Sequence, residues 1–276
     1  MVTATVLALS AALLHATWNL ILKVSDERDA AFWAQYLIGA VVSVPVVAVI
    51  GLPHHAAWPF LAVSSVLQVI YVTGLSRAYR HGDFSLAYPL SRGSGALLAA
   101  LGGSLLIGDH LSVLSWIGVA VVAASLVLLM GRGASRESLA WAVFTGVTIA
   151  SYSLVDASGS RHAGSGAAYG FTLQVLTGVT MSVVGFARHR QRAMVRMLRT
   201  NFWRLFAAGV LVTLAYTMVV IAFRYAPVGY VSVLRESSVV IGALLGWVFL
   251  HERLGRHRLV SAVVMTVGLA LLVGGS

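Results

Sequence analysis

Three charged side chains lie well inside stretches of the sequence that are otherwise almost wholly apolar, away from the ends of those stretches. Arg92 stands in the stretch 84–107, and Arg235 and Glu236 stand in the stretch 228–250. A charged side chain at the centre of a membrane-spanning helix costs roughly 2.5–3.5 kcal/mol, so such groups usually face the protein interior. Because a guanidinium group matches carboxylates and phosphates, Arg92 and Arg235 are candidates to bind an anionic substrate group. The alternatives are that Arg235 pairs with a nearby carboxylate, or that either arginine reaches the membrane surface.

Two carboxylates are candidates for proton coupling. Burial favours the protonated form of a carboxylate, so a buried one can exchange a proton during a transport cycle. Glu236 is the stronger candidate, and its alternative is a permanent structural ion pair. Asp156 directly follows the apolar stretch 139–155, and this end position favours contact with water.

The first apolar stretch carries a row of polar side chains. His15, Asn19 and Lys23 are spaced four residues apart and therefore share one face of a helix. A polar row on a lipid-embedded helix is expected to face a cavity or a partner helix. Trp18 lies beside this row and could stack on a substrate, although tryptophan is also common at membrane interfaces. Lys23 is expected to be an interfacial anchor.

Tyrosines supply further polar groups on apolar bodies. Tyr88 and Tyr152 are candidates to line a substrate site, while the alternative for each tyrosine is a hydrogen bond to a neighbouring carbonyl. The same choice applies to Tyr79, Tyr216 and Tyr230.

The sequence gives no sign of a metal site, a cofactor or a catalytic centre. There is no cysteine, and His15, His54 and His55 show neither metal-ligand spacing nor a matching carboxylate cluster. A His-Glu-x-x-His zinc motif, a P-loop and a Gly-x-Ser-x-Gly motif are all absent from the sequence. We therefore expect a protein that is not an enzyme.

The composition requires a membrane as the surroundings of these residues. Hydrophobic residues make up 59% of the 276 positions and charged residues only 10%, whereas soluble domains carry about 25% charged residues. A spanning helix needs about 20 apolar residues, and long unbroken runs argue against the alternating pattern of a β-barrel. The first run lacks a basic leader and a small-residue cleavage site, so we expect it to be retained as a helix. Ten apolar runs predict an all-α integral membrane protein: 2–22, 32–52, 60–79, 84–107, 113–130, 139–155, 167–187, 202–225, 228–250 and 259–273.

The formal charge of +10 is distributed unevenly between the connections of these runs. Even-numbered connections contain only Arg161, and thirteen of the nineteen Lys and Arg residues fall in odd-numbered ones. An excess on one side is the positive-inside pattern, which predicts odd connections in the cytoplasm and both termini outside. Membrane topology therefore accounts for the positive charge, and no binding of nucleic acid is expected. The segment from Arg188 to Arg199 could bind anionic lipid, or could simply hold its connection in the cytoplasm.

The two halves of the sequence echo each other. At an offset of 143 residues, Arg92 falls on Arg235 and Asp109 on Glu252. Residues 1–131 and 138–276 are thus predicted to be two repeats of five helices. Because five is an odd number of membrane crossings, the two repeats have opposite orientations in the membrane, as in many secondary transporters. The same offset matches two small-residue faces, expected either to pack tightly or to slide: Gly95, Ala99 and Gly103 with Ser238, Gly242 and Gly246.

Short motifs resemble the EamA-like ten-helix carriers of the drug/metabolite transporter superfamily. The resemblance rests on residues 14–19 and 78–89 and on the helix exits near Asp109 and Glu252. It implies two five-helix repeats around a central cavity, and metabolite movement without ATP hydrolysis. It also implies cytoplasmic termini, contrary to the arginine distribution, so both orientations stay open.

The functional prediction is a secondary transporter that moves a small polar metabolite by alternating access. Eighteen arginines against one lysine indicate a GC-rich bacterial genome, hence a bacterial cytoplasmic membrane. The alternatives are an intramembrane enzyme and a non-transporting sensor or assembly factor. The sequence is compatible with a monomer or a homodimer.

Overall fold

The computed structural model describes residues 1–22, 28–81, 84–128, 135–250 and 256–275. Every regular element within these ranges is a helix. The elements are α1 (Val2–Leu22), α2 (Arg28–Ile50), η1 (His55–Ala57), α3 (Trp58–His81), α4 (Phe84–Gly102), η2 (Gly103–Ile107), α5 (Val113–Leu128), α6 (Arg136–His162), α7 (Gly166–Ala187), α8 (Gln191–Ala222), α9 (Val228–Leu234), α10 (Ser237–Leu250) and α11 (Arg256–Gly274).

The helices coincide with the predicted apolar runs. Among the described residues, seven helices are long and apolar enough to cross a membrane, and two shorter apolar ones, Val113–Leu128 and Leu259–Gly274, accompany them. The prediction of an all-α protein is confirmed. The ninth run differs from expectation because it forms two helices, α9 and α10, separated at Arg235 and Glu236.

Two helices are longer than predicted. α6 continues to His162, beyond the expected end at residue 155. α8 begins at Gln191, so most of the basic segment from Arg188 to Arg199 is helical rather than an irregular connection. A kink at Asn201, with φ −131° and ψ 29°, separates this basic part from the apolar remainder of α8.

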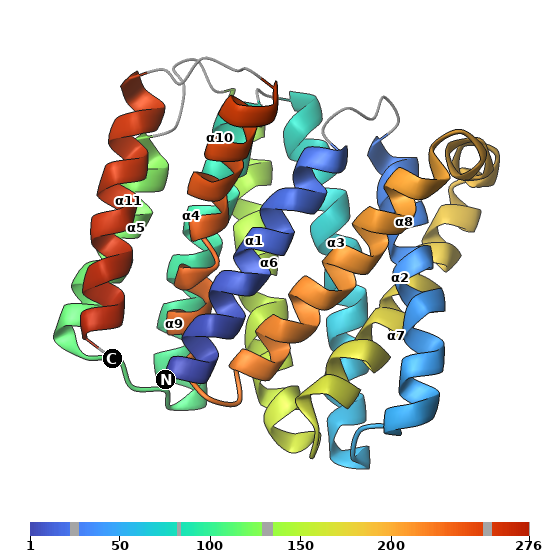
Figure 1. Ribbon diagram of the computed structural model, residues 1–276, viewed down its shortest axis with the longest axis horizontal. Coiled ribbons are helices and arrows are strands. Elements are labelled where there is room, and N and C mark those ends of the chain that lie inside the picture. Colours follow the sequence, from blue (N-terminus) through green and yellow to red (C-terminus); the bar gives the residue numbers. More distant parts are fainter. Residues whose placement is uncertain (23–27, 82–83, 129–134, 251–255, 276) are drawn as a thin grey trace.

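With α9 and α10 taken together, successive α-helices of the chain run in alternating directions, and both termini lie at one end of the bundle (Figure 1). The connection between α7 and α8, with its exposed Arg188 and Arg190, lies at the opposite end. Arg136, also exposed, begins α6 at that same opposite end. The basic side chains described here are therefore gathered mainly at the end away from the termini.

The helices bury small residues and expose large apolar ones. On α1, Ala4, Ala8 and Ala12 are fully buried, while Val6 and Leu13 are at least half exposed. A soluble helix would show the opposite arrangement, because water penalises exposed leucine and valine. In lipid the large side chains meet a matching solvent, and small residues let helix backbones approach closely. The packing on α1 is that of a membrane protein.

The contacts between helices follow a reciprocal pattern. α6 packs against α3 and α4, and α1 packs against α8, α9 and α10. The pairs α2 with α7 and α5 with α11 lie side by side. Each half thus places its first helix among the third and fourth helices of the other half.

Glycines of the two predicted small-residue faces differ in how closely a neighbour approaches. A Cβ at Gly95 would lie 2.8 Å from Cγ2 and 2.9 Å from Cβ of Ile149 on α6, which is closer than real contacts allow. A Cβ at Gly242 on α10 would lie 4.0 Å from the Cβ of Ala16 on α1, an ordinary van der Waals distance. α4 therefore requires a glycine against α6, whereas α10 leaves space for a methyl group against α1.

We predict that Gly95→Ala and Gly242→Ala change stability in opposite directions. Gly95→Ala should destabilise the fold by about 1–3 kcal/mol, the usual cost of overpacking. Gly242→Ala should be neutral or stabilising by up to about 1 kcal/mol, because alanine is the better helix former. Thermal unfolding of the purified variants measures both effects. Equal losses of stability in the two variants would contradict the packing described here.

Candidate functional site

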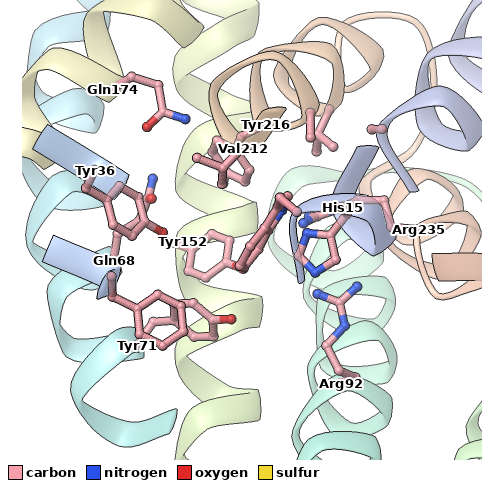
Figure 2. Close-up of a pocket in the computed structure, with 15 residues that line it drawn as sticks. His15, Tyr36, Gln68, Tyr71, Arg92, Tyr152, Gln174, Val212, Tyr216 and Arg235 are labelled. Carbon is pink, nitrogen blue, oxygen red and sulfur yellow. The ribbon is translucent and has the colours of Figure 1, made fainter. Parts of the chain in front are cut away.

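A polar cavity lies among the helices, and both halves of the chain line it (Figure 2). The charged and hydrogen-bonding residues on its wall come from α1, α3, α4, α7 and the break between α9 and α10. They are His15, Gln68, Arg92, Gln174 and Arg235. The aromatic residues on its wall are Trp18, Phe32, Tyr36, Tyr71, Tyr152 and Tyr216.

The break between α9 and α10 brings two charged residues into the bundle. The backbone is tightened there, since Glu236 N donates to Val233 O at 3.0 Å and Val239 N to Glu236 O at 2.9 Å. Arg235 and Glu236 are buried, with 7% and 3% of their surface exposed. Interrupted helices that carry polar groups inward are a common basis of binding sites in membrane transporters.

Arg92 and Glu236 form a buried ion pair between the two halves. Arg92 Nη2 lies 2.9 Å from Glu236 Oε1, and Arg92 Nε donates to Glu236 Oε2 at 3.1 Å. Two parallel bonds of this kind hold a carboxylate in a fixed orientation. The partner of Glu236 is thus an arginine 144 residues away in the sequence, rather than the adjacent Arg235. Neither of the two arginines extends to the surface.

Arg235 has a different environment from Arg92. Within the described part of the chain, its guanidinium has no hydrogen bond or ion pair. Its recorded partner is the ring of Tyr216, whose centroid lies 5.6 Å from Arg235 Cζ. A cation over a tyrosine face is stabilised by the ring quadrupole but stays able to bind an anion. Arg235 also lines the cavity.

Asp156 is not in contact with water, contrary to the expectation from its place after the apolar run. It is fully buried because α6 continues past it. Tyr169 on α7 donates a hydrogen bond of 2.9 Å to its Oδ1, and Tyr216 on α8 donates one to its Oδ2. Tyr216 therefore connects the Asp156 carboxylate with the cavity and with Arg235.

The polar row on α1 is only partly directed into the cavity. His15 and Trp18 line it and lie edge to face, with ring centroids 4.9 Å apart. The side-chain amide of Asn19 instead donates to the carbonyl of His15 at 2.8 Å, within the same helix. Lys23 lies outside the described residues.

The tyrosines that were candidates from the sequence lie in different parts of the structure. Tyr152 and Tyr216 line the cavity, and their rings are 5.9 Å apart. Tyr230 lies away from it and shares a hydrogen bond of 2.7 Å with Thr5. Tyr88 belongs to α4, but its side chain, like that of Tyr79, is outside the described part of the structure.

Several residues of the cavity wall were not singled out in the sequence, namely Phe32, Tyr36, Gln68, Tyr71 and Gln174. A glutamine in the middle of an apolar run was a usable signal, since an amide in hydrocarbon needs a partner. Among the described residues, Gln68 Nε2, both polar atoms of the Gln174 amide, and Trp18 Nε1 are buried without a hydrogen-bond partner. Buried polar atoms without partners are rare, so a ligand or water that reached these atoms would gain hydrogen bonds.

The end of the bundle that carries the termini is joined by a second ion pair. Arg161 Nη1, at the end of α6, lies 2.9 Å from Asp109 Oδ1 in the connection before α5. Asp109 Oδ2 also accepts from the backbone N of Val228 at 2.6 Å, at the start of α9. Arg161 Nε donates to the carbonyl of Phe223 at 2.9 Å. This cluster ties the two halves together at that end.

Metal binding receives no support from the described residues, among which no group of three His, Asp or Glu side chains could hold an ion. The cavity wall instead offers a guanidinium, amides, an indole and phenol groups. The cavity has a volume of about 40 Å³ in this structure, so these groups could contact a small organic molecule by charge, hydrogen bonds and ring contacts only in a conformation that widens it.

Comparison with known proteins identifies the chain's relatives. The EamA-like transporter family matches residues 137–274. The chain belongs to this family. It is therefore a multi-pass membrane protein of a transporter family, and this membership points away from an enzyme. The resemblance noted in the sequence motifs is confirmed.

Two relatives add to this assignment. An "Uncharacterized transporter in cobO 3'region" from Sinorhizobium sp. is 35% identical over 72 residues, which cover 26% of this chain and 50% of the relative. The chain thus spans about half the length of this curated relative. A protein of known crystal structure is similar over 98% of this chain and 96% of its own, with a TM-score of 0.79 and 17% identity. That likeness concerns the fold alone.

We predict that the Arg92–Glu236 pair stabilises the fold only when both partners are present. Arg92→Leu leaves the Glu236 carboxylate buried without its hydrogen-bonded partner and should cost about 3–5 kcal/mol. The double replacement of Arg92 and Glu236 by leucine should recover most of that loss, because neither position then carries an unpaired charge. Unfolding of the two single variants and the double variant in detergent measures the coupling. Additive losses would show that the two side chains do not interact.

Proposed function

We propose that this protein is a secondary carrier that moves a small polar metabolite by alternating access, with two inverted five-helix halves, 1–131 and 138–276, rocking about the central cavity. The observation that carries the proposal is a polar cavity lined by both halves within a bundle whose outer surface is apolar. Alternating access needs such a site between two bodies that can move relative to each other.

The reciprocal packing supports the inverted repeat. If α1 corresponds to α6, α3 to α8, and α4 to α9 with α10, then exchanging the halves reproduces the same contacts. α6 against α3 and α4 becomes α1 against α8, α9 and α10, and the pairs α2–α7 and α5–α11 are unchanged. In Figure 1, α1 and α6 run in opposite directions, as an inverted pair must.

The positions of the two matched arginines also support it. Arg92 and Arg235 occupy corresponding sites of the two halves, and both line the cavity. In the carrier that we propose, a shared site near the axis between inverted repeats would be approached from either side in turn. Transport of this kind would draw on gradients, consistent with a sequence that lacks a nucleotide-binding loop.

The ion pair between Asp109 and Arg161 supports a cycle in which the two ends open alternately. It links the halves at the end that carries the termini. The proposal assigns this cluster to the closed end of the carrier, and the arginine-rich opposite end to the cytoplasm by the positive-inside rule. The family resemblance implies the reverse orientation, so labelling from each side of the membrane is needed.

We predict that single cysteines at Val2 and Arg136 are labelled from opposite sides of the membrane. The natural chain contains no cysteine, so each variant carries a single reactive thiol, and both sites are exposed. A membrane-impermeant maleimide should modify one site in intact cells and the other only in inverted vesicles. Labelling of both from one side would exclude inverted halves. The side on which Val2 reacts decides between the two orientations.

We also predict that the purified protein in liposomes exchanges a metabolite down an imposed gradient without ATP, and that Arg235→Gln lowers this flux. Removing a charged hydrogen-bond donor should reduce flux by about tenfold or more at limiting substrate. The matched control is Arg77→Gln, because Arg77 is exposed and lies 5.1 Å over the ring of Trp141, away from the cavity wall. Normal flux in Arg235→Gln would remove Arg235 from the site.

A further inference from the structure

The two arginines on the cavity wall differ in whether they are free to bind an anion. This difference limits the class of molecule that the cavity can bind. Arg92 is held by Glu236 at 2.9 Å and 3.1 Å, so this pair contributes no net charge. Arg235 is 7% exposed, faces the cavity, and has no anionic partner among the described residues. Among the described residues, the cavity therefore offers one guanidinium, that of Arg235, that lacks a counter-ion.

In the described part of this cavity, a cationic group could contact aromatic rings but no carboxylate. No Asp or Glu is among the described residues that line it. Glu236 is engaged by Arg92, and Asp156 lies behind the cavity wall, where Tyr169 and Tyr216 donate to it. A buried ammonium without a carboxylate is strongly disfavoured, which argues against organic cations and against zwitterions such as free amino acids.

The side of the cavity away from Arg235 is neutral but rich in hydrogen-bonding groups. In Figure 2, Arg235, Arg92 and His15 lie on one side, and Gln68, Tyr36 and Gln174 lie on the other. The amide atoms of Gln68 and Gln174 named above have no hydrogen-bond partner among the described residues. A second anionic group at the other end of a ligand would meet neutral amides there and no counter-charge.

Tyrosine rings connect the two sides. Tyr71 and Tyr152 lie with ring centroids 5.6 Å apart at 72°, and Tyr152 and Tyr216 lie 5.9 Å apart at 70°. Such an edge-to-face row presents ring faces and edges to the cavity, and it favours a flat or apolar ligand body.

From these features we infer that the cavity binds small organic monoanions. The anionic group, a carboxylate or sulfonate, binds Arg235, a flat or apolar body lies along the tyrosines, and a neutral hydroxyl or amide group meets Gln68 and Gln174. This assignment rests on the carrier function proposed above and names the class of its substrate.

The experiment measures binding with a set of para-hydroxyphenyl compounds that differ in charge. The probes are para-hydroxybenzoate (monoanion), para-hydroxybenzamide (neutral), para-hydroxybenzylamine (cation), tyrosine (zwitterion) and para-hydroxyphenyl phosphate. Thermal stabilisation and tryptophan fluorescence of the wild-type protein in lipid nanodiscs report binding. We expect para-hydroxybenzoate to bind most tightly of the five. Tighter binding of the cation, the zwitterion or the phosphate, or no binding of the benzoate at millimolar concentration, overturns the inference.

Variants locate the binding group. Arg235→Gln should weaken para-hydroxybenzoate binding by about 10- to 100-fold, as expected for loss of a charged hydrogen bond, and Arg77→Gln should leave it unchanged. Unaltered binding by a folded Arg235→Gln protein contradicts the assignment. Should that variant fail to fold, the wild-type series alone decides the charge class.

Counterflow in liposomes separates this inference from the proposed function. If para-hydroxybenzoate binds but is not exchanged, the carrier proposal fails and the ligand class stands. If a cation or a zwitterion is exchanged instead, the carrier proposal stands and the ligand class is wrong.

Discussion

The ion pair between Arg92 and Glu236 is the interaction on which the arrangement of the bundle depends. Hydrocarbon cannot solvate either group, so α4 and the break between α9 and α10 must meet in the interior. Because the partners come from different halves, this requirement also sets how the halves face each other. It neutralises one of two matched arginines and leaves Arg235 as the cation that faces the cavity. In the sequence, Glu236 follows Arg235, whereas Gly93 follows Arg92 at the position matched by the offset of 143 residues.

Packing around this pair depends on small residues rather than on the exclusion of water. Gly95 and Gly146 lie where α4 meets α6, and a Cβ at Gly146 would clash with Ser94. Where lipid replaces water, close backbone contact is a main source of helix association. The looser contact of α10 with α1 at Gly242 shows that the two corresponding interfaces are not packed equally.

The sequence was sufficient to predict the helices and the two arginines of the cavity, and insufficient for their partners. Apolar runs locate membrane helices because hydrocarbon admits little else, and a charge within such a run must face inward. The pairing of Arg92 with Glu236 joins residues far apart in the chain, and no local pattern indicates it. Asp156 was misjudged because helix ends are the least certain feature of such runs. The amides of Gln68 and Gln174 were not predicted, because a neutral amide within an apolar run is a weaker signal than a charge.

The carboxylate of Asp109 has two tasks at once. It holds Arg161, and it accepts from the first backbone N–H of α9, the short helix that leads to Arg235. In a carrier of the proposed kind, separating the two halves at this end would leave the start of α9 without its acceptor. The movement that lets water enter at this end would therefore also loosen α9, the helix that leads to the proposed anion-binding residue Arg235. In such a carrier, ligand release and opening of this end would be one coupled movement, because the Asp109 side chain takes part in both.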